Sequence, residues 1–274
     1  MLRSYVVTGG GRGVGRAVVE RLLAGGAAVV AVELDPGALA WTAGHPAGER
    51  LTPLAGDAGD EAVTERAADL AEAAGRLAGW VNNAAVFSDA DLHAAGGAGR
   101  VLELVRANLR PALAGSATAV RRFLAADPPG GAIVNVSSHQ AARPVPGAVA
   151  YATAKAAVEG LTRALAVDYG PHGVRANAVA LGTVATGRHR AALAAMGQAA
   201  ATGRQAELAR LHPLGRVGAP DEAAAAVAWL LGDAASFVSG AVVPVDGGRS
   251  VLGQDPEARD PVARPGPATG PSAR

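Results

Sequence analysis

The stretch SYVVTGGGRGVG, residues 4–15, joins a short β-branched run directly to a glycine-rich turn and then to an alanine- and leucine-rich segment. It contains the pattern T-G-x-x-x-G-x-G, with Gly9, Gly13 and Gly15, and matches G-x-G-x-x-G at no register. Backbone amides at a helix N-terminus point outward unpaired, and glycines there let a phosphate approach closely. We therefore expect a strand, a turn that holds a pyrophosphate, and a helix. A tight turn without a ligand is the alternative.

The alternation of strand and helix continues along the chain. The pattern predicts strands over 4–8, 27–33, 51–56, 79–83, 131–137, 174–180 and 240–248, and helices near 13–25, 60–74, 99–126, 151–169 and 219–231. Strict alternation, with strands that are apolar on both faces, indicates a parallel sheet covered on two sides. The sequence thus predicts an α/β fold, a doubly wound sheet in three layers, as a single domain over residues 1–250.

Two features mark the end of the chain. Pro244 has no N–H to donate to a neighbouring strand, so the last strand should lie at an edge of the sheet. Residues 251–274 are rich in proline, glycine and small residues and show no periodicity, which predicts a disordered tail.

The composition argues against several classes of protein. A net charge of +1 predicts no binding to nucleic acid or to an anionic membrane, and no apolar run approaches the roughly 20 residues of a spanning helix. Without cysteine the chain has no disulfide, no thiolate nucleophile and no cysteine-ligated zinc, which suits the cytoplasm. His139 has no partner at ligand spacing, so we predict no metal site.

A carboxylate lies where a dinucleotide sheet requires one. Glu33 ends the second predicted strand, 18 residues after Gly15, and is placed to accept hydrogen bonds from adenosine ribose hydroxyls. It would repel a 2′-phosphate, which favours NAD over NADP, whereas Arg12 would favour NADP. Asp35 is the alternative ribose ligand, and a solvated turn carboxylate is a third possibility. Asp57, after the third strand, is expected beside the adenine amine.

The single lysine of the chain lies four residues after one of three tyrosines. On a helix, Tyr151 and Lys155 share a face, and an ammonium there should stabilise the phenolate and lower its pKa toward the working pH. Such a tyrosine is a general acid and base at a carbonyl or alcohol oxygen. Ser138, thirteen residues earlier at a strand end, would hold that oxygen. Asn108 is conspicuous inside a predicted helix, although a solvent-facing asparagine is the alternative.

Taken together, these motifs resemble the short-chain dehydrogenase/reductase family over about residues 3–248. The matches are T-G-G-G-R-G-V-G at 8–15, N-N-A-A at 82–85, Asn108, S-S at 137–138, Y-A-T-A-K at 151–155, G-T-V-A-T at 182–186, H-P-L-G-R-V-G-A-P at 212–220 and V-D-G-G at 245–248. Two positions depart from the family pattern. Leu181 replaces a proline before Gly182, and Ala85 replaces a glycine.

The resemblance implies a seven-stranded Rossmann-type sheet, hydride transfer with a nicotinamide cofactor, and a homotetramer or homodimer. Its catalytic tetrad would be Asn108, Ser138, Tyr151 and Lys155, where Lys155 also binds the nicotinamide ribose and Asn108 holds a water. The implied cofactor contacts are Gly9, Arg12, Gly13, Val14, Gly15, Glu33, Asp57, Ala58, Asn83, Ala84, Tyr151, Lys155, Gly182, Val184 and Thr186.

The substrate region is less defined. Residues 187–211 correspond to the family's mobile lid, and Arg188, His189 and Arg190 there would meet an anionic substrate group or form a solvated helix face. His139 and Gln140 are expected to line the pocket.

The preferred function is an NAD-dependent oxidoreductase acting on a secondary alcohol or ketone. An NADPH-dependent 3-oxoacyl-[acyl-carrier-protein] reductase is the alternative within the enzyme class. A non-catalytic nucleotide-sensing scaffold is the alternative outside it.

Overall fold

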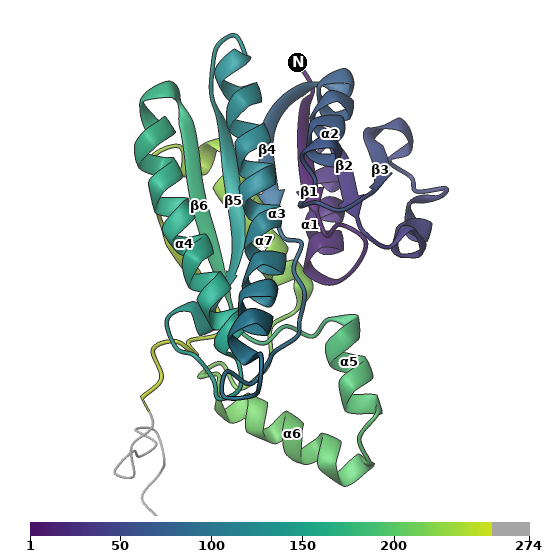
Figure 1. Cartoon of the computed structure of the whole chain (residues 1–274). Helices are drawn as coiled ribbons and strands as arrows, with labels where there is room; N and C mark the ends of the chain where they lie inside the picture. Colours follow the sequence, from purple (N-terminus) through teal and green to yellow (C-terminus); the bar gives the residue numbers. More distant parts are fainter. Residues whose placement is uncertain (254–274) are drawn as a thin grey trace, which may run out of the picture.

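The computed structural model describes residues 1–253. Its centre is a seven-stranded sheet in the order β3-β2-β1-β4-β5-β6-β7, and every neighbouring pair is parallel (Figure 1). The strands are β1 (Arg3–Thr8), β2 (Ala28–Glu33), β3 (Leu51–Ala55), β4 (Arg76–Asn82), β5 (Gly131–Ser138), β6 (Val174–Leu181) and β7 (Val242–Val245). The predicted fold is confirmed, and most predicted strands differ from these bounds by only one to three residues.

The strand order places a topological switch between β1 and β4. From β1 the chain builds outward through β2 and β3, then crosses to β4 and continues through β7 on the other side. In open α/β sheets a ligand crevice forms at such a point, outside the carboxyl ends of the strands. All the predicted strand-end residues therefore lie at one rim of the sheet.

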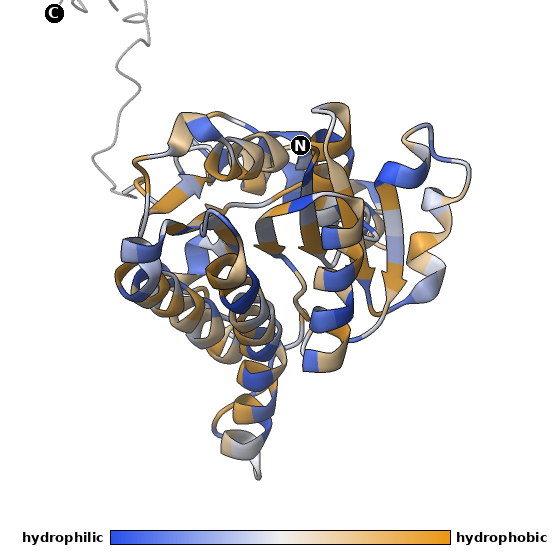
Figure 2. Cartoon of the chain, turned by 90° about the horizontal axis from the view of Figure 1, so that it is seen from above, coloured by the Kyte–Doolittle hydropathy of each residue, from blue (hydrophilic) through white to orange (hydrophobic). Residues whose placement is uncertain are grey.

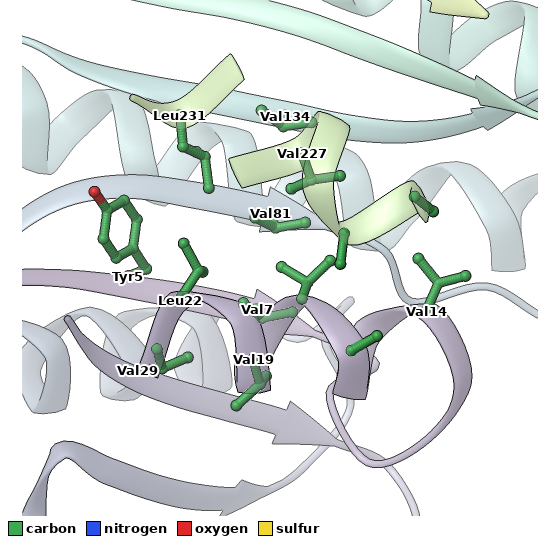
Figure 3. Packing of buried hydrophobic residues seen from close by; sticks show 14 of the residues in the cluster. Tyr5, Val7, Val14, Val19, Leu22, Val29, Val81, Val134, Val227 and Leu231 are labelled. Atoms are coloured by element: carbon green, nitrogen blue, oxygen red, sulfur yellow. The ribbon is translucent and has the colours of Figure 1, made fainter. Parts of the chain in front are cut away.

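Five helices cover the two faces of the sheet. They are α1 (Gly13–Ala24), α2 (Glu61–Ala74), α3 (Gly97–Ala125), α4 (Val149–Tyr169) and α7 (Pro220–Leu231). One hydrophobic core lies between the sheet and helices α1 and α7, and includes Val7, Val29, Leu22 and Val227 (Figure 3). A second core, with Trp80 and Phe123 completely buried, lies beneath α2, α3 and α4. The strands are apolar on both faces because helices cover both (Figure 2).

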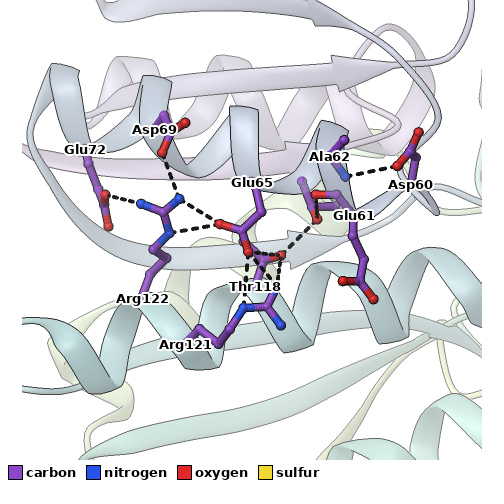
Figure 4. A network of polar contacts seen from close by, with 10 residues as sticks. Asp60, Glu61, Ala62, Glu65, Asp69, Glu72, Thr118, Arg121 and Arg122 are labelled. Carbon is purple, nitrogen blue, oxygen red and sulfur yellow. Dashed lines mark hydrogen bonds and ion pairs between the residues drawn. The ribbon is translucent and has the colours of Figure 1, made fainter.

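An ion-pair cluster joins α2 to α3 at the surface (Figure 4). The Arg122 guanidinium donates to Glu65 at 2.7 Å, to Asp69 at 2.7 Å and to Glu72 at 2.8 Å, and Arg121 also pairs with Glu65. Beneath them the buried hydroxyls of Thr64 and Thr118 are 2.9 Å apart. The cluster fixes α3, which carries Asn108.

Helices α5 (Gly187–Ala194) and α6 (Gln198–Arg210) extend away from the sheet at its carboxyl end (Figure 1). Neither helix has a buried residue. The resemblance implied a lid here, and a solvated helix face was one expectation for its basic residues. No helix bounds were predicted, because neither segment shows the apolar stripe of a core-facing helix.

Proline occurs in both edge strands, Pro53 in β3 and Pro244 in β7. The edge position predicted from Pro244 is confirmed. Of the predicted tail, residues 254–274 lie outside the described part of the chain. Within residues 1–253, no helix combines the length and apolar character needed to cross a bilayer.

Candidate active site

The glycine turn connects β1 to α1 under tight steric constraints. Gly13 has a φ of 57°, in the left-handed region that favours glycine. A Cβ on Gly15 would lie 2.0 Å from the Gly9 carbonyl oxygen, so the helix meets the turn only because that atom is missing. The Asn83 amide donates to the carbonyls of Thr8 at 3.0 Å and Gly9 at 3.1 Å. The ends of β1 and β4 are thus fixed around a turn with a free helix N-terminus.

The Glu33 carboxylate lies at this turn. It accepts from the backbone N–H of Gly11 at 3.2 Å and of Leu34 at 2.9 Å. The alternative, Asp35, instead accepts from Gly37 N–H at 2.9 Å and pairs with the exposed Arg12. Because Asp35 already balances Arg12, Glu33 is the carboxylate at the turn without a guanidinium partner among residues 1–253.

Asp57 and Ala58 follow β3, as predicted. The Asp57 carboxylate accepts from Gly59 N–H at 2.8 Å, and Ala58 is buried. They lie beyond Glu33 along the carboxyl rim, since β3 is the neighbour of β2.

Tyr151 and Lys155 occupy one face of α4, at the carboxyl end of β5. The buried Lys155 ammonium donates to the Val136 carbonyl at 2.7 Å and lies 5.6 Å from the centre of the Tyr151 ring. Burial lowers the pKa of Lys155 to about 8. The predicted juxtaposition of phenol and ammonium is present.

The electrostatics of the phenol differ from the expectation. Burial raises the pKa of Tyr151, and the nearby Ser138 hydroxyl and the charge of Arg188 partly oppose that rise. The expected lowering of the phenol pKa by Lys155 is not seen among the described residues. The Lys155 ammonium instead donates to the Val136 carbonyl and is itself desolvated.

Ser138 is the last residue of β5 and is buried. Its hydroxyl accepts from Gln140 N–H at 3.2 Å, which begins a short 3-10 turn and aims the oxygen at the rim. The adjacent Ser137 hydroxyl points the other way and donates to Glu159 at 2.9 Å. Of the two serines, Ser138 is therefore the one beside Tyr151.

Asn108 is buried inside α3, so the alternative of a solvent-facing asparagine is wrong. Its amide nitrogen donates to the Leu104 carbonyl at 3.0 Å, and its oxygen accepts from Val86 N–H at 3.1 Å. Asn108 thus fixes the loop that follows β4.

The loop after β6 returns across the glycine turn. A Cβ on Gly182 would lie 2.8 Å from the Asp246 Cα, and Val184 pairs with Gly218. The Thr186 side chain is the nearest group to a Cβ built on Gly13, at 3.3 Å. Of these three residues, Thr186 therefore lies beside the glycine turn, whereas Gly182 contacts Asp246 and Val184 pairs with Gly218. Leu181, the departure from the family pattern, is buried in β6 and leaves this path intact.

The sequence did not identify a stack of side chains over the phenol. The Phe87 ring lies 5.5 Å from the Tyr151 ring, centre to centre, and the Arg188 guanidinium carbon lies 3.2 Å from the centre of the Phe87 ring. The available signal was the rarity of phenylalanine, with three in the chain, at an exposed position just after N-N-A-A.

Behind Ser138 lies a group of buried polar residues. Burial and the nearby charge of Arg249 lower the pKa of His139 to about 4, although Asp246 acts in the opposite direction. His212 accepts from Thr183 N–H at 3.3 Å while its other ring nitrogen contacts the Leu208 carbonyl at 2.6 Å. This pairing ties the end of α6 to the loop that carries Thr186. The Gln140 side-chain oxygen is buried and has no partner within residues 1–253.

Comparisons with known proteins agree with this arrangement. The family model described as "Enoyl-(Acyl carrier protein) reductase" matches residues 9–250. A 2,5-dichloro-2,5-cyclohexadiene-1,4-diol dehydrogenase from Sphingobium indicum is 37% identical over 253 residues, 91% of this chain and 98% of the relative. Levodione reductase from Leifsonia aquatica is 34% identical over 254 residues, 90% of this chain and 94% of that protein.

Solved structures give the same result. Aldohexose dehydrogenase from Thermoplasma acidophilum has a TM-score of 0.79 at 30% identity, covering 97% of this chain and 98% of that one. A short-chain dehydrogenase/reductase family oxidoreductase from Burkholderia thailandensis has a TM-score of 0.80 at 32% identity, over 92% and 94% of the two chains. With a matching family model, relatives above 30% identity over nearly the whole length, and the same sheet, this chain belongs to the short-chain dehydrogenase/reductase family of oxidoreductases, acting on alcohol or ketone groups.

Proposed function

We propose that this protein is a cytoplasmic, NAD-dependent oxidoreductase that interconverts a secondary alcohol and a ketone, with Tyr151 as the general acid and base. The observation that carries the proposal is the meeting of Tyr151, Lys155 and Ser138 at the carboxyl end of β5. A phenol held beside a hydroxyl, with an ammonium one helical turn away, is an arrangement suited to proton transfer at a carbonyl oxygen.

The turn between β1 and α1 fits a dinucleotide. A side chain on Gly9, Gly13 or Gly15 would meet other atoms or require an unfavourable backbone, so the surface beside the helix N-terminus stays open to a phosphate. When bound, a nicotinamide cofactor supplies or accepts the hydride. Asn83 and Ala84 after β4, and Thr186 after β6, lie beside this turn, and we assign Gly182 and Val184 to the same cofactor surface.

The protein's own residues would move and hold the proton. Tyr151 gives its proton to the carbonyl oxygen in reduction and takes it back in oxidation, while Ser138 donates a hydrogen bond to that oxygen. Lys155 binds the ribose next to the nicotinamide, and Asn108 holds a water that relays the proton. A tyrosine with an ordinary or a raised pKa is protonated at neutral pH and can donate its proton in ketone reduction.

Glu33 supports NAD as the preferred cofactor, because its carboxylate lies at the turn and would repel a 2′-phosphate. Arg12, which would attract that phosphate, is paired with Asp35. The alternative, an NADPH-dependent 3-oxoacyl-[acyl-carrier-protein] reductase, requires the opposite preference. A scaffold without catalysis does not account for Tyr151 and Lys155 together.

The decisive experiment replaces Tyr151 by phenylalanine. We expect Tyr151→Phe to lose nearly all turnover, at least about 100-fold, because general acid–base catalysis contributes roughly that much or more. Its NAD dissociation constant should stay within a factor of about three. Turnover is followed spectrophotometrically with a panel of alcohols and ketones, and NAD binding by calorimetry.

Tyr169→Phe is the matched control, a tyrosine at the far end of the same helix. It should keep the activity of the parent protein. Equal, nonzero turnover in Tyr151→Phe and the parent would refute the assignment.

We also propose a homotetramer or homodimer in which α3 and α4 pack against a second copy. Large apolar side chains on these helices are exposed, namely Leu102, Leu113, Leu124 and Val167. Light scattering on the purified protein tests this proposal. A monomer at micromolar concentration would contradict it.

A further inference from the structure

The geometry points to Arg188 as a specificity-determining residue that selects substrates carrying a negatively charged group near the reacting carbonyl. This inference rests on the proposed function, because it concerns the substrate of the same site. It names a substrate class, namely keto acids and the corresponding hydroxy acids or other anionic ketones.

Arg188 is held beside the phenol by its stacking on Phe87. The guanidinium carbon is 3.2 Å from the centre of the Phe87 ring, and the centre of the Tyr151 ring lies 5.5 Å from that of Phe87. Stacking uses the flat face of a guanidinium and leaves its in-plane N–H groups free. Arg188 thus presents a fork of donors at the mouth of the site, in the geometry that matches a carboxylate or phosphate.

The charge of Arg188 is not balanced within the protein. Among residues 1–253, no carboxylate lies within ion-pair distance of Arg188 and no acceptor takes a hydrogen bond from it, whereas Arg12, Arg121, Arg122 and Arg216 each pair with an acid. Although Arg188 is exposed as a residue, partial desolvation of its guanidinium lowers its pKa. A guanidinium that has lost part of its hydration and gained no partner favours binding an anion.

The neighbouring basic residues do not share this position. Arg190 differs from Arg188 because its guanidinium already donates to the Ala185 carbonyl at 2.8 Å, within its own loop. Asp89 is the one acid whose charge acts on Tyr151, and it raises the phenol pKa where Arg188 lowers it. Asp89 and Arg188 are both exposed, so solvent screens the charges of both, and selection of an anion rests on the direct hydrogen bonds that the Arg188 guanidinium can donate.

The test compares three keto acids with their methyl esters: 3-oxobutanoate, 4-oxopentanoate and 4-oxocyclohexane-1-carboxylate. With NADH saturating, we expect the parent protein to have a higher kcat/KM for at least one acid than for its ester. Arg188→Gln should lower the value for that acid roughly 10- to 100-fold, the effect of removing a charged hydrogen bond, and change the ester less than about threefold. Arg188→Lys should restore part of the loss.

Arg204→Gln is the matched control, because it removes the charge of an exposed arginine on α6 of the same lid. It should leave both rates unchanged. Equal losses for acid and ester in Arg188→Gln, or no loss, would overturn the inference.

A binding measurement separates this inference from the catalytic proposal. The acids and esters are titrated by calorimetry into NADH-saturated Tyr151→Phe and into the same variant carrying Arg188→Gln. The inference is supported if an acid binds to Tyr151→Phe more tightly than its ester does, and if this preference is lost when Arg188→Gln is added. This holds even if neither protein turns over. Absence of any acid preference in this titration refutes it, whatever the catalytic result.

Discussion

At the scale of single residues, a missing atom at Gly15 matters as much as any side chain. Its helix approaches the Gly9 carbonyl so closely that even a methyl group would overlap the oxygen. This contact joins two positions six residues apart in the sequence; the glycines of T-G-x-x-x-G-x-G predicted the strand, turn and helix, but not the contact itself. The spacing of Tyr151 and Lys155 was equally informative, because four residues make about one turn of a helix.

Other residues were beyond prediction because their environment is made by distant segments. Phe87 and Arg188 are about a hundred residues apart and meet only because the β4 and β6 loops end at the same rim. The pKa of Tyr151 likewise depends on burial that no local pattern reports. The predicted roles of Lys155 and Asn108 in catalysis remain predictions.

His139 gives a pH-dependent stability. Its pKa is about 4 in the folded protein and about 6.5 when unfolded, so between these values the unfolded chain binds the additional proton. Folding is therefore favoured as the pH rises from 4 to 6.5 and disfavoured as it falls. We expect His139→Gln to remove up to about 3 kcal/mol of this dependence.

The measurement is urea unfolding of both proteins at pH 7.5 and pH 4.5. The unfolding free energy of the variant, relative to that of the parent, should be higher at pH 4.5 than at pH 7.5. His93→Gln, at an exposed position, is the control and should keep the dependence of the parent. An unchanged pH dependence in His139→Gln would contradict the assignment.

At the scale of helices and strands, the sequence predicted the elements that pack against the core and did not predict the bounds of the two exposed helices. Strands β1 to β7 and helices α1, α2, α3, α4 and α7 bury apolar faces, and their periodicity is readable. Helices α5 and α6 bury no side chain, so their sequences carry no such pattern. The ion pairs between α2 and α3 were also not predicted, because they join residues 50 or more positions apart.

Arg122 should contribute measurably to the attachment of α2 to α3. Its side chain is 25% exposed and contacts three carboxylates. This ion-pair network should therefore stabilise the fold more than an isolated surface ion pair does. We expect Arg122→Met to lower the unfolding free energy by about 1 kcal/mol, and less in high salt. Arg100→Met, which removes an exposed pair on the same α3, should change it by less than about 0.5 kcal/mol.

Urea unfolding at low and high salt provides the measurement. A loss in Arg122→Met that does not depend on salt would assign the effect to packing of the side-chain stem instead.

At the scale of the whole molecule, binding of a dinucleotide should stabilise the fold, since the crevice joins β1, β2, β4 and β6. NAD at about 100 times its dissociation constant adds about 2.7 kcal/mol to the unfolding free energy. Because of Glu33, we expect a larger rise of the melting temperature with NAD than with NADP at equal concentration. Glu33→Gln should reduce the difference between the melting-temperature rise with NAD and that with NADP.

Thermal unfolding with each cofactor checks this prediction. A larger rise with NADP in the parent protein would exclude NAD as the preferred cofactor and favour the acyl-carrier-protein reductase alternative.

The prolines in both edge strands limit how copies of this protein can meet. An amide nitrogen without hydrogen leaves a gap in the row of donors that an incoming chain would need, on the β3 side through Pro53 and on the β7 side through Pro244. Fibril-like growth of the sheet is therefore discouraged at its two margins. At high protein concentration, the edge strands of different copies should therefore rarely pair through their backbones.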